Sequence, residues 1–369
     1  MTENIRPVYI EVNLHQLQKN IEAVRTHVGP AKIMPMIKAN AYGHGVDGVA
    51  PFIEPYVDYF GVAILEEGIH LRQLGITKPI LVAGGTLPEQ VPYFAKYDLT
   101  LTGSSVELLG IANEVSWTTN KRIKTHLKFD TGMERVGVHE YDAGTLIEKS
   151  LACNHLDIEG IYTHLANSEM ADKTYSLLQL ERFQTVLDVY RKLSVPVPAL
   201  RHVNNSGGIL NLPEAHFDMV RPGILFYGVY PGDEVSRVVD VKPALTWHAR
   251  VAYSKRTQPG RMVSYGSLWQ AEDETRIVTI PCGYADGYFR RMTNRAQVLI
   301  QHKKYPQVGR ICMDQFMVNV GDTEVNAGDD VVLLGGGIGV EDFAEWMGTN
   351  EYEVLTSISA RVPRVFINE

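Results

Sequence analysis

The chain has 369 residues, of which 45% are hydrophobic and 21% are charged, ordinary values for a soluble globular protein with a substantial core. Its formal net charge of −8 argues against a nucleic-acid-binding protein, because phosphate binding requires a basic face. No window approaches ~20 consecutive apolar residues, so the sequence predicts no membrane-spanning helix.

The three cysteines, Cys153, Cys282 and Cys312, are far apart and form no CxxC pair. This spacing argues against a disulfide framework or a structural metal site and favours a reducing compartment. The opening segment MTENIRPVYIEV lacks the basic start and the apolar stretch of a signal peptide. We therefore expect a cytoplasmic protein without a metal site.

Residues 1–235 are predicted to form an α/β barrel. An opening strand, Val8–Val12, precedes Asn13, which can cap a helix with Gln16 three residues later. Helix-like stretches such as Tyr175–Leu193 separate most of the eight short strand candidates that follow. These candidates are Ile33–Ile37, Tyr59–Ile64, Pro79–Ala83, Leu99–Thr102, Ile123–Phe129, Ile158–Thr163, Ala199–Val203 and Phe217–Val220. Eight βα repeats indicate a (β/α)8 TIM-type barrel, although the periodicity also fits a doubly wound sheet.

Residues 236–369 are predicted to form a second, mainly β domain. The change of character comes at Pro231–Pro243. The strand-like runs that follow are joined by Gly, Asp and Asn turns, and they are LTWHARVAYSKR, TRIVTI, AQVLIQ, FMVNV and VVLLG. Helical patterns return only at Val340–Met347 and Tyr352–Ile358.

Polar residues cluster where the predicted barrel strands end. They are Lys38 after the first strand, Lys128 and Asp130 at the fifth, His164 after the sixth, Asn204, Asn205 and Ser206 after the seventh, and Arg221 and Gly223 after the eighth. Each residue alone could be a structural cap or an ion-pair partner. In a TIM barrel, however, these ends meet at one mouth, which is where active sites lie.

Two features of this mouth suggest pyridoxal phosphate (PLP). Lys38, in MIKANAYGHG, follows an apolar strand, and burial of its stem would lower its pKa from ~10.4, as covalent attachment of an aldehyde requires. Ser206 precedes two glycines and Gly223 precedes Ile224, so two helix starts would lie beside the last two strands, the usual phosphate site of this fold. A lysine and a phosphate site together are typical of PLP. Taken singly, a surface lysine and ordinary glycine turns also fit.

Nine segments resemble the alanine racemases, in family order and over nearly the whole chain. They are MIKANAYGHG, HLKFDTGMERVG, IYTHLAN, HVNNSGGIL, VRPGILFYG, VSYGSLW, IPCGYADGY, VGRICMDQFMV and YEVLTSISARVPRV. The resemblance implies an α/β barrel followed by a β domain, PLP as the cofactor, and interconversion of L- and D-alanine that supplies peptidoglycan. It also implies a homodimer whose active sites combine one chain's barrel with the other chain's C-terminal domain.

Carried over residue by residue, the resemblance makes Lys38 the PLP lysine and the base for D-alanine, and Tyr265 the base for L-alanine in the partner's site. Positions matching phosphate ligands are Tyr42, Ser206, Gly223, Ile224 and Tyr352. We also expect Asn205, which follows the seventh strand, to bind the cofactor. Arg221 matches the arginine facing the pyridine nitrogen, with His164 behind it.

The remaining implied roles concern the substrate. Arg135, the backbone N–H of Met313, and Asp314 match the residues around the substrate carboxylate. Lys128 matches a lysine that is carbamylated in many family members and orients Arg135. The corridor into the site is matched by Asp172, Tyr284, Arg290 and Arg310.

Three positions depart from the family pattern, namely Glu134 beside Arg135, where many family members have glycine, Asn204, and Trp269. The glutamate could weaken substrate binding or point to solvent. Alternatives to an alanine racemase are a serine or broader-spectrum racemase and a non-catalytic PLP-binding protein, which lacks a C-terminal β domain. A decarboxylase of the same fold is disfavoured because Arg221 replaces the carboxylate expected at the pyridine nitrogen.

Overall fold

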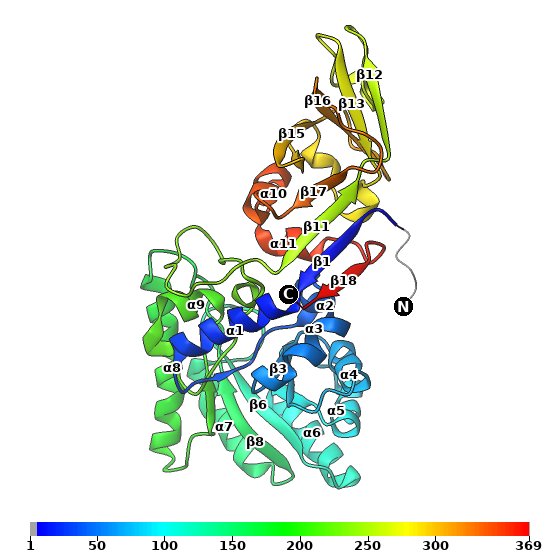
Figure 1. Cartoon of the computed structure of the whole chain (residues 1–369). Helices are drawn as coiled ribbons and strands as arrows, with labels where there is room; N and C mark the ends of the chain where they lie inside the picture. Colours follow the sequence, from blue (N-terminus) through cyan, green and yellow to red (C-terminus); the bar gives the residue numbers. More distant parts are fainter. Residues whose placement is uncertain (1–5, 369) are drawn as a thin grey trace. The chain divides into compact units, whose positions relative to one another are not determined.

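The structure is a computed structural model that describes residues 6–368 (Figure 1). The chain divides into two compact units. The barrel unit contains Leu17–Ala41 and Val46–Lys242, and the C-terminal unit contains the residues up to Gln16, Tyr42–Gly45 and Pro243–Glu369. Among the residues that the structure describes, no helix is long and apolar enough to cross a membrane.

Eight parallel strands form the barrel, at the eight places that the sequence predicts. They are β2 (Lys32–Ile33), β3 (Phe60–Val62), β4 (Ile80–Val82), β5 (Thr100–Gly103), β6 (Ile123–Asp130), β8 (Leu156–Tyr162), β9 (Leu200–His202) and β10 (Met219–Val220). A short strand, β7 (Val138–His139), pairs with the end of β6.

Backbone hydrogen bonds close the ring. Strands β3, β4, β5, β6, β8 and β9 pair in that order, and β10 pairs with β2. A parallel bridge between Met36 and Gly61 joins the first strand to β3, and Asp218 N–H donates to the Arg201 carbonyl oxygen at 3.0 Å between β10 and β9. The barrel prediction is therefore confirmed, and the doubly wound alternative is wrong.

Helices follow most strands of the barrel unit (Figure 1). They are α1 (Leu14–Val28), α3 (Val46–Ile53), α4 (Leu65–Gln73), α5 (Val91–Tyr97), α6 (Val106–Thr119), α7 (Ala143–Ala152), α8 (Thr174–Lys192) and α9 (Ser206–Asn211). The predicted cap of α1 is confirmed, because Asn13 Oδ1 accepts from Gln16 N–H at 2.9 Å. Helix α8 lies within one residue of its predicted bounds.

The segment directly after the first barrel strand is a left-handed turn. It is labelled α2 (Lys38–Tyr42), but Ala39, Asn40 and Ala41 have φ between 51° and 55°. Left-handed backbone costs an L-residue roughly 1–2 kcal/mol. Tertiary contacts must hold this turn, because its sequence contains no glycine before Gly43.

The C-terminal unit is built on a nine-stranded sheet with the order β12-β13-β16-β15-β14-β17-β11-β1-β18. The strands are β1 (Tyr9–Asn13), β11 (Leu245–Arg250), β12 (Tyr253–Thr257), β13 (Thr275–Ile280), β14 (Gln297–Ile300), β15 (Lys303–Val308), β16 (Phe316–Gly321), β17 (Asp330–Leu334) and β18 (Arg364–Ile367). Two helices, α10 (Val340–Met347) and α11 (Glu351–Thr356), accompany the sheet. Strands β15 and β18 are not among the strands predicted from the sequence.

The opening strand belongs to this second sheet. Strand β1 pairs antiparallel with β11 and parallel with β18, so residues up to Gln16 group with the C-terminal segment. The sequence-based prediction assigned these opening residues to the barrel domain, residues 1–235. Alternation of partly buried and buried residues in β1 shows that one face of the strand is buried, but it does not show which sheet the strand joins.

Candidate active site

Lys38 stands at the C-terminal end of the first barrel strand, half-buried at the mouth. Burial lowers its pKa, the Arg135 guanidinium lowers it further, and the Glu67 carboxylate acts in the opposite direction. A lysine amine at such a place loses its proton more readily than an exposed one. It can therefore act as a nucleophile or as a base.

Arg221, just beyond β10, is buried at the same mouth. Its Nη1 contacts His202 Nδ1 at 2.8 Å, and its Nη2 donates to the Thr163 and Val203 carbonyl oxygens, each at 2.8 Å. His164 Nδ1 lies 3.2 Å from the same Nη2. Within residues 6–368 these bonds use the two terminal nitrogens alone, which leaves the Nε–H as a further donor.

His164 and His202 are kept neutral around this guanidinium. Burial is the main reason that the pKa of each lies well below the usual value, and the charge of Arg221 adds to the effect. Burial also lowers the pKa of Arg221 to about 10, so it remains protonated at neutral pH. The mouth therefore holds a fixed positive charge, and no carboxylate among residues 6–368 is directly bonded to it.

A relay of buried side chains, which the sequence analysis did not identify, continues from Arg221 through the barrel core. His202 Nε2 lies 2.8 Å from His126 Nδ1, and His126 Nε2 lies 3.2 Å from Glu159 Oε1. Tyr59 donates to the same carboxylate oxygen at 3.0 Å. The sequence signal for this relay was the presence of polar residues within barrel strands, namely His126 in β6, Glu159 in β8 and His202 in β9.

Lys128 lies on β6 within reach of the same cluster. Its ammonium donates to the Phe129 carbonyl oxygen at 2.8 Å and lies 5.2 Å from the centroid of the Tyr162 ring. Burial, together with the charges of Arg221 and Arg135, lowers the pKa of Lys128 to about 7, although Asp130 opposes this shift. A large fraction of Lys128 is therefore neutral at physiological pH.

Asp130 shapes the loop that carries Arg135. Its Oδ1 accepts from the backbone N–H groups of Gly132, Met133 and Glu134 at 2.9–3.1 Å, and its Oδ2 accepts from Arg135 N–H at 2.9 Å. These bonds outweigh burial and lower the pKa of Asp130. Its role is to fix the loop.

Glu134 turns away from the cluster. Its carboxylate forms an exposed ion pair with His139 at 3.0 Å, which raises the pKa of that histidine. Its φ of 53° is left-handed, a conformation that glycine adopts without cost. This backbone requirement explains why glycine suits the position.

The helix starts after β9 and β10 are tied together. The Ser206 hydroxyl oxygen accepts from Gly223 N–H at 2.8 Å and from Leu225 N–H at 3.3 Å. Ile224 opens the short 3₁₀ helix η5 (Ile224–Tyr227). Asn205 caps α9 by accepting from Gly208 N–H at 3.1 Å. This places the hydroxyl and backbone donors that the sequence predicts in one small region.

The C-terminal unit gathers a second set of predicted residues. One cavity of about 600 Å³ is lined by Tyr265, Tyr284, Arg290, Arg310, Met313 and Asp314, among others. Asp314 also pairs with Arg361 at 2.6 Å, and Arg361 pairs with the buried Asp286 at 2.6 Å. Tyr42 and Tyr352 lie together in this unit, with ring centroids 6.1 Å apart.

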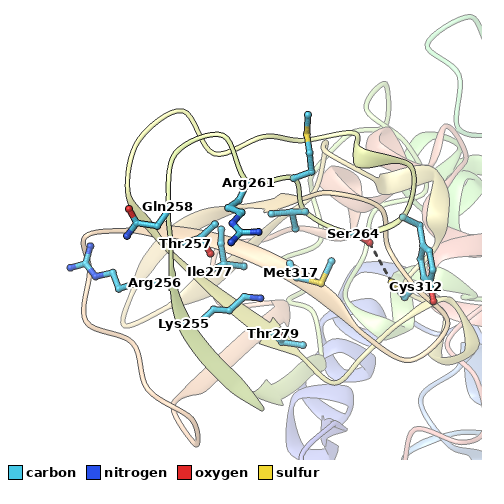
Figure 2. A pocket seen from close by; sticks show the side chains of 13 residues that line it. Lys255, Arg256, Thr257, Gln258, Arg261, Ser264, Ile277, Thr279, Cys312 and Met317 are labelled. Carbon is cyan, nitrogen blue, oxygen red and sulfur yellow. Dashed lines mark hydrogen bonds between the residues drawn. The ribbon is translucent and has the colours of Figure 1, made fainter.

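Tyr265 projects from a strained turn. Its side chain is 71% exposed, Ser264 before it has φ 65°, and Gly266 after it has φ 74°. The Ser264 hydroxyl donates to the Arg310 carbonyl oxygen at 2.6 Å and lies 3.5 Å from Cys312 Sγ. Figure 2 shows this pair at one end of a second cavity, of about 700 Å³, whose other end carries Arg256 and Gln258.

Three further residues that the sequence singles out make local hydrogen bonds or packing contacts. Asp172 Oδ1 accepts from Thr174 N–H and from its hydroxyl, so it forms a local turn just before α8. Asn204 is buried and donates to the Leu212 carbonyl oxygen at 2.9 Å. Trp269 packs against the cluster of Val263, Ile277 and Val308.

Fold and site together define a two-part barrel enzyme, with a lysine of lowered pKa in one unit and an exposed phenol in the other. Two family models match the chain: the N-terminal domain of alanine racemase over residues 12–231, and the C-terminal domain of alanine racemase over residues 244–366. The chain belongs to the alanine racemase family, a family of PLP-dependent isomerases.

Individual relatives agree along the full length. The alanine racemase of Carboxydothermus hydrogenoformans is 46% identical over 370 residues, covering 98% of this chain and 100% of that protein. The solved alanine racemase of Clostridium difficile 630 has a TM-score of 0.94 at 36% identity and covers 98% of this chain and 96% of that chain. That of Bartonella henselae, with covalently bound pyridoxal phosphate, has a TM-score of 0.89 at 28% identity, covering 98% and 99%. The family, fold and cofactor predicted from the motifs are confirmed.

Proposed function

We propose that this chain interconverts L- and D-alanine with two bases, Lys38 and Tyr265, acting on opposite faces of the α-carbon. The observation that carries the proposal is the half-buried Lys38 amine, whose pKa is lowered at a barrel mouth that also holds the guanidinium of Arg221. A racemase must take the α-proton from one face and return one to the other, so it needs a base on each side.

The residues present fit PLP. Lys38 offers an amine for covalent attachment, and the Nε–H of Arg221 is a donor not used within the described residues. The Ser206 hydroxyl, which accepts from Gly223 N–H just before Ile224, keeps its own proton to donate to a phosphate. Tyr42 and Tyr352 would add phenol groups to the phosphate site. Bound PLP supplies the electron withdrawal that makes the α-proton of the amino acid acidic.

Arg221 sets the character of the reaction. A guanidinium only donates hydrogen bonds, so it leaves a pyridine nitrogen unprotonated, whereas a carboxylate would hold a proton there. Arg221 would thereby weaken electron withdrawal by bound PLP and favour prompt return of the proton over side reactions. His202 supports the guanidinium as a neutral acceptor from Nη1, and the neutral His164 ring lies 3.2 Å from Nη2.

Arg135 and the backbone N–H of Met313 would bind the substrate carboxylate, beside Asp314. Lys128 would carry a carbamate that accepts a hydrogen bond from Arg135, because only a neutral amine adds CO2 and the pKa of Lys128 is about 7. Asp172, Tyr284, Arg290 and Arg310 would line the corridor into the site.

We further propose a homodimer in which Tyr265 and Met313 serve the partner's barrel. The 71% exposure of Tyr265 supports this arrangement, since a general base inside a site of its own chain would be covered, and Met313 is likewise 52% exposed. Supply of D-alanine to peptidoglycan and a cytoplasmic location stay predictions.

A coupled assay of D-alanine formation from L-alanine tests the proposal, with L-serine run in parallel. We expect turnover of alanine, much slower turnover of serine, and loss of activity in Lys38→Ala. Equal turnover of serine would instead support a broader-spectrum racemase. Activity retained in Lys38→Ala would remove Lys38 from its role.

A further inference from the structure

Glu67 is a half-buried carboxylate that touches the backbone of the lysine segment. Its Oε1 accepts from Ala39 N–H, the residue after Lys38, at 2.6 Å. Its Oε2 accepts from the N–H groups of Ala63 and Ile64, at 2.8 and 3.3 Å, at the end of β3. One side chain therefore joins the ends of the first two barrel strands.

The second of these contacts is an ordinary helix cap. Glu67 is the third residue of α4, and a glutamate there commonly accepts from the backbone N–H just before the helix. The first contact has no such explanation, because Ala39 lies 28 positions earlier in the chain. It holds the first residue of the left-handed turn, where φ is 51°.

The left-handed turn needs a restraint of this kind. The left-handed conformation of Ala39, Asn40 and Ala41 is unfavourable for residues with a side chain. Their neighbour Lys38 needs an accurately oriented amine to react with the substrate. Asn40 Oδ1 holds the far side by accepting from Val46 N–H at 2.8 Å. Glu67 holds the near side, next to the reactive residue.

Glu67 also contributes charge. The charge of Arg135 lowers the pKa of the Lys38 amine, and the charge of Glu67 raises it. The carboxylate thus favours the protonated lysine, the form that must return a proton to the α-carbon when L-alanine is the substrate.

We propose that Glu67 is a positioning residue for Lys38: through Ala39 N–H it fixes the turn that aims the lysine. This inference rests on the proposed function. It predicts that damage to Glu67 slows the proton transfers of Lys38 and leaves those of Tyr265 intact.

The test compares Glu67→Gln, Glu67→Asp and Glu66→Gln as PLP-loaded enzymes. A glutamine has one acceptor oxygen and cannot serve both backbone sites, and an aspartate keeps the charge but is too short to span them. Glu66 is the exposed neighbour on the same helical turn and serves as the matched control.

We expect kcat to fall about 10- to 100-fold in both Glu67 variants, as for a reactive group misplaced by about 1 Å. The α-deuterium isotope effect should rise for D-alanine, whose proton Lys38 removes, and fall for L-alanine, whose proton Tyr265 removes. Hydrogen exchange followed by mass spectrometry should show faster exchange of the Ala39 amide. Glu66→Gln should match the wild type in all three measurements.

Faster Ala39 exchange with both isotope effects unchanged would overturn the inference, because Glu67 would then only stabilise the turn. Unchanged exchange would overturn it as well, since the contact would not hold the backbone. An inactive wild type would refute the proposed function itself, whereas an active wild type with symmetric losses in the Glu67 variants would refute only the role of Glu67. Glu67→Asp keeps these outcomes accessible if Glu67→Gln folds poorly.

Discussion

Single side chains at the barrel mouth are tuned by burial next to positive charge. Lys38, Lys128, Arg135 and Arg221 are all basic, and mutual repulsion together with desolvation lowers the pKa of both lysines. The site proposed above would use this positive charge to bind a cofactor phosphate and an amino-acid carboxylate. It also makes the neutral amine available where chemistry needs it.

Lys128 offers a test at this scale. Its amine is protonated below a pKa of about 7 and neutral above it, so bicarbonate should restore the activity of CO2-depleted enzyme better above that pH than below it. Loss of a charge-assisted bond to Arg135, worth ~1.5–3 kcal/mol, predicts a fall of roughly 10- to 100-fold in the depleted enzyme. Lys128→Met should lose the same activity and not respond. A wild type indifferent to bicarbonate would contradict the carbamate.

Neighbouring strands cooperate at the scale of elements. The Arg221 guanidinium can only donate, so His202 Nδ1 is the acceptor in their contact. The proton of neutral His202 is then on Nε2, which donates a hydrogen bond to His126 Nδ1. His126 then donates from Nε2 to Glu159. Side chains on β9, β6 and β8 thus share one consistent direction of donation that ends at a carboxylate.

Replacement of His126 tests this relay. In His126→Leu the buried His202 N–H loses its acceptor, which should destabilise the protein by roughly 1–3 kcal/mol and lower kcat through a displaced Arg221. In His126→Asn the amide oxygen can take the place of Nδ1, so much of the activity should return. Urea unfolding and alanine turnover measure the two effects. Equal loss in both variants would show that packing, rather than donation, matters there.

At the scale of the whole molecule, the proposed dimer makes a quantitative prediction. Lys38→Ala and Tyr265→Phe should each be nearly inactive, since one general base contributes about 10²–10⁴-fold. When the two variants are unfolded together in equal amounts and refolded, random pairing makes half of the dimers hybrids. Each hybrid has one site with both defects and one with neither, so about a quarter of the wild-type activity should return.

The control is each variant refolded alone, which should stay inactive. If Tyr265 served its own chain, each site of a hybrid would carry one defect and no activity would return. Mass spectrometry of the intact dimers establishes that hybrids have formed.

The sequence by itself determined the eight barrel strands, most of the second sheet, the family and the cofactor. These follow from local periodicity and from motifs such as MIKANAYGHG, which are properties of contiguous residues. Strand β1 could not be assigned to a sheet from its pattern, because alternation does not identify a partner strand. Strands β15 and β18 were not predicted, because their hydrophobic and polar residues do not alternate regularly.

Only the tertiary structure decided which distant residues act on one another. The contacts of Glu67 with Ala39, of His202 with His126, and of Glu134 with His139 rather than with the cluster all depend on how side chains are aimed. The lowered pKa of Lys128 likewise arises from burial and from charges that lie far away in the chain. Chemistry is set by such proximity, which residue spacing alone does not encode, because folding brings sequence-distant groups into one region of low dielectric.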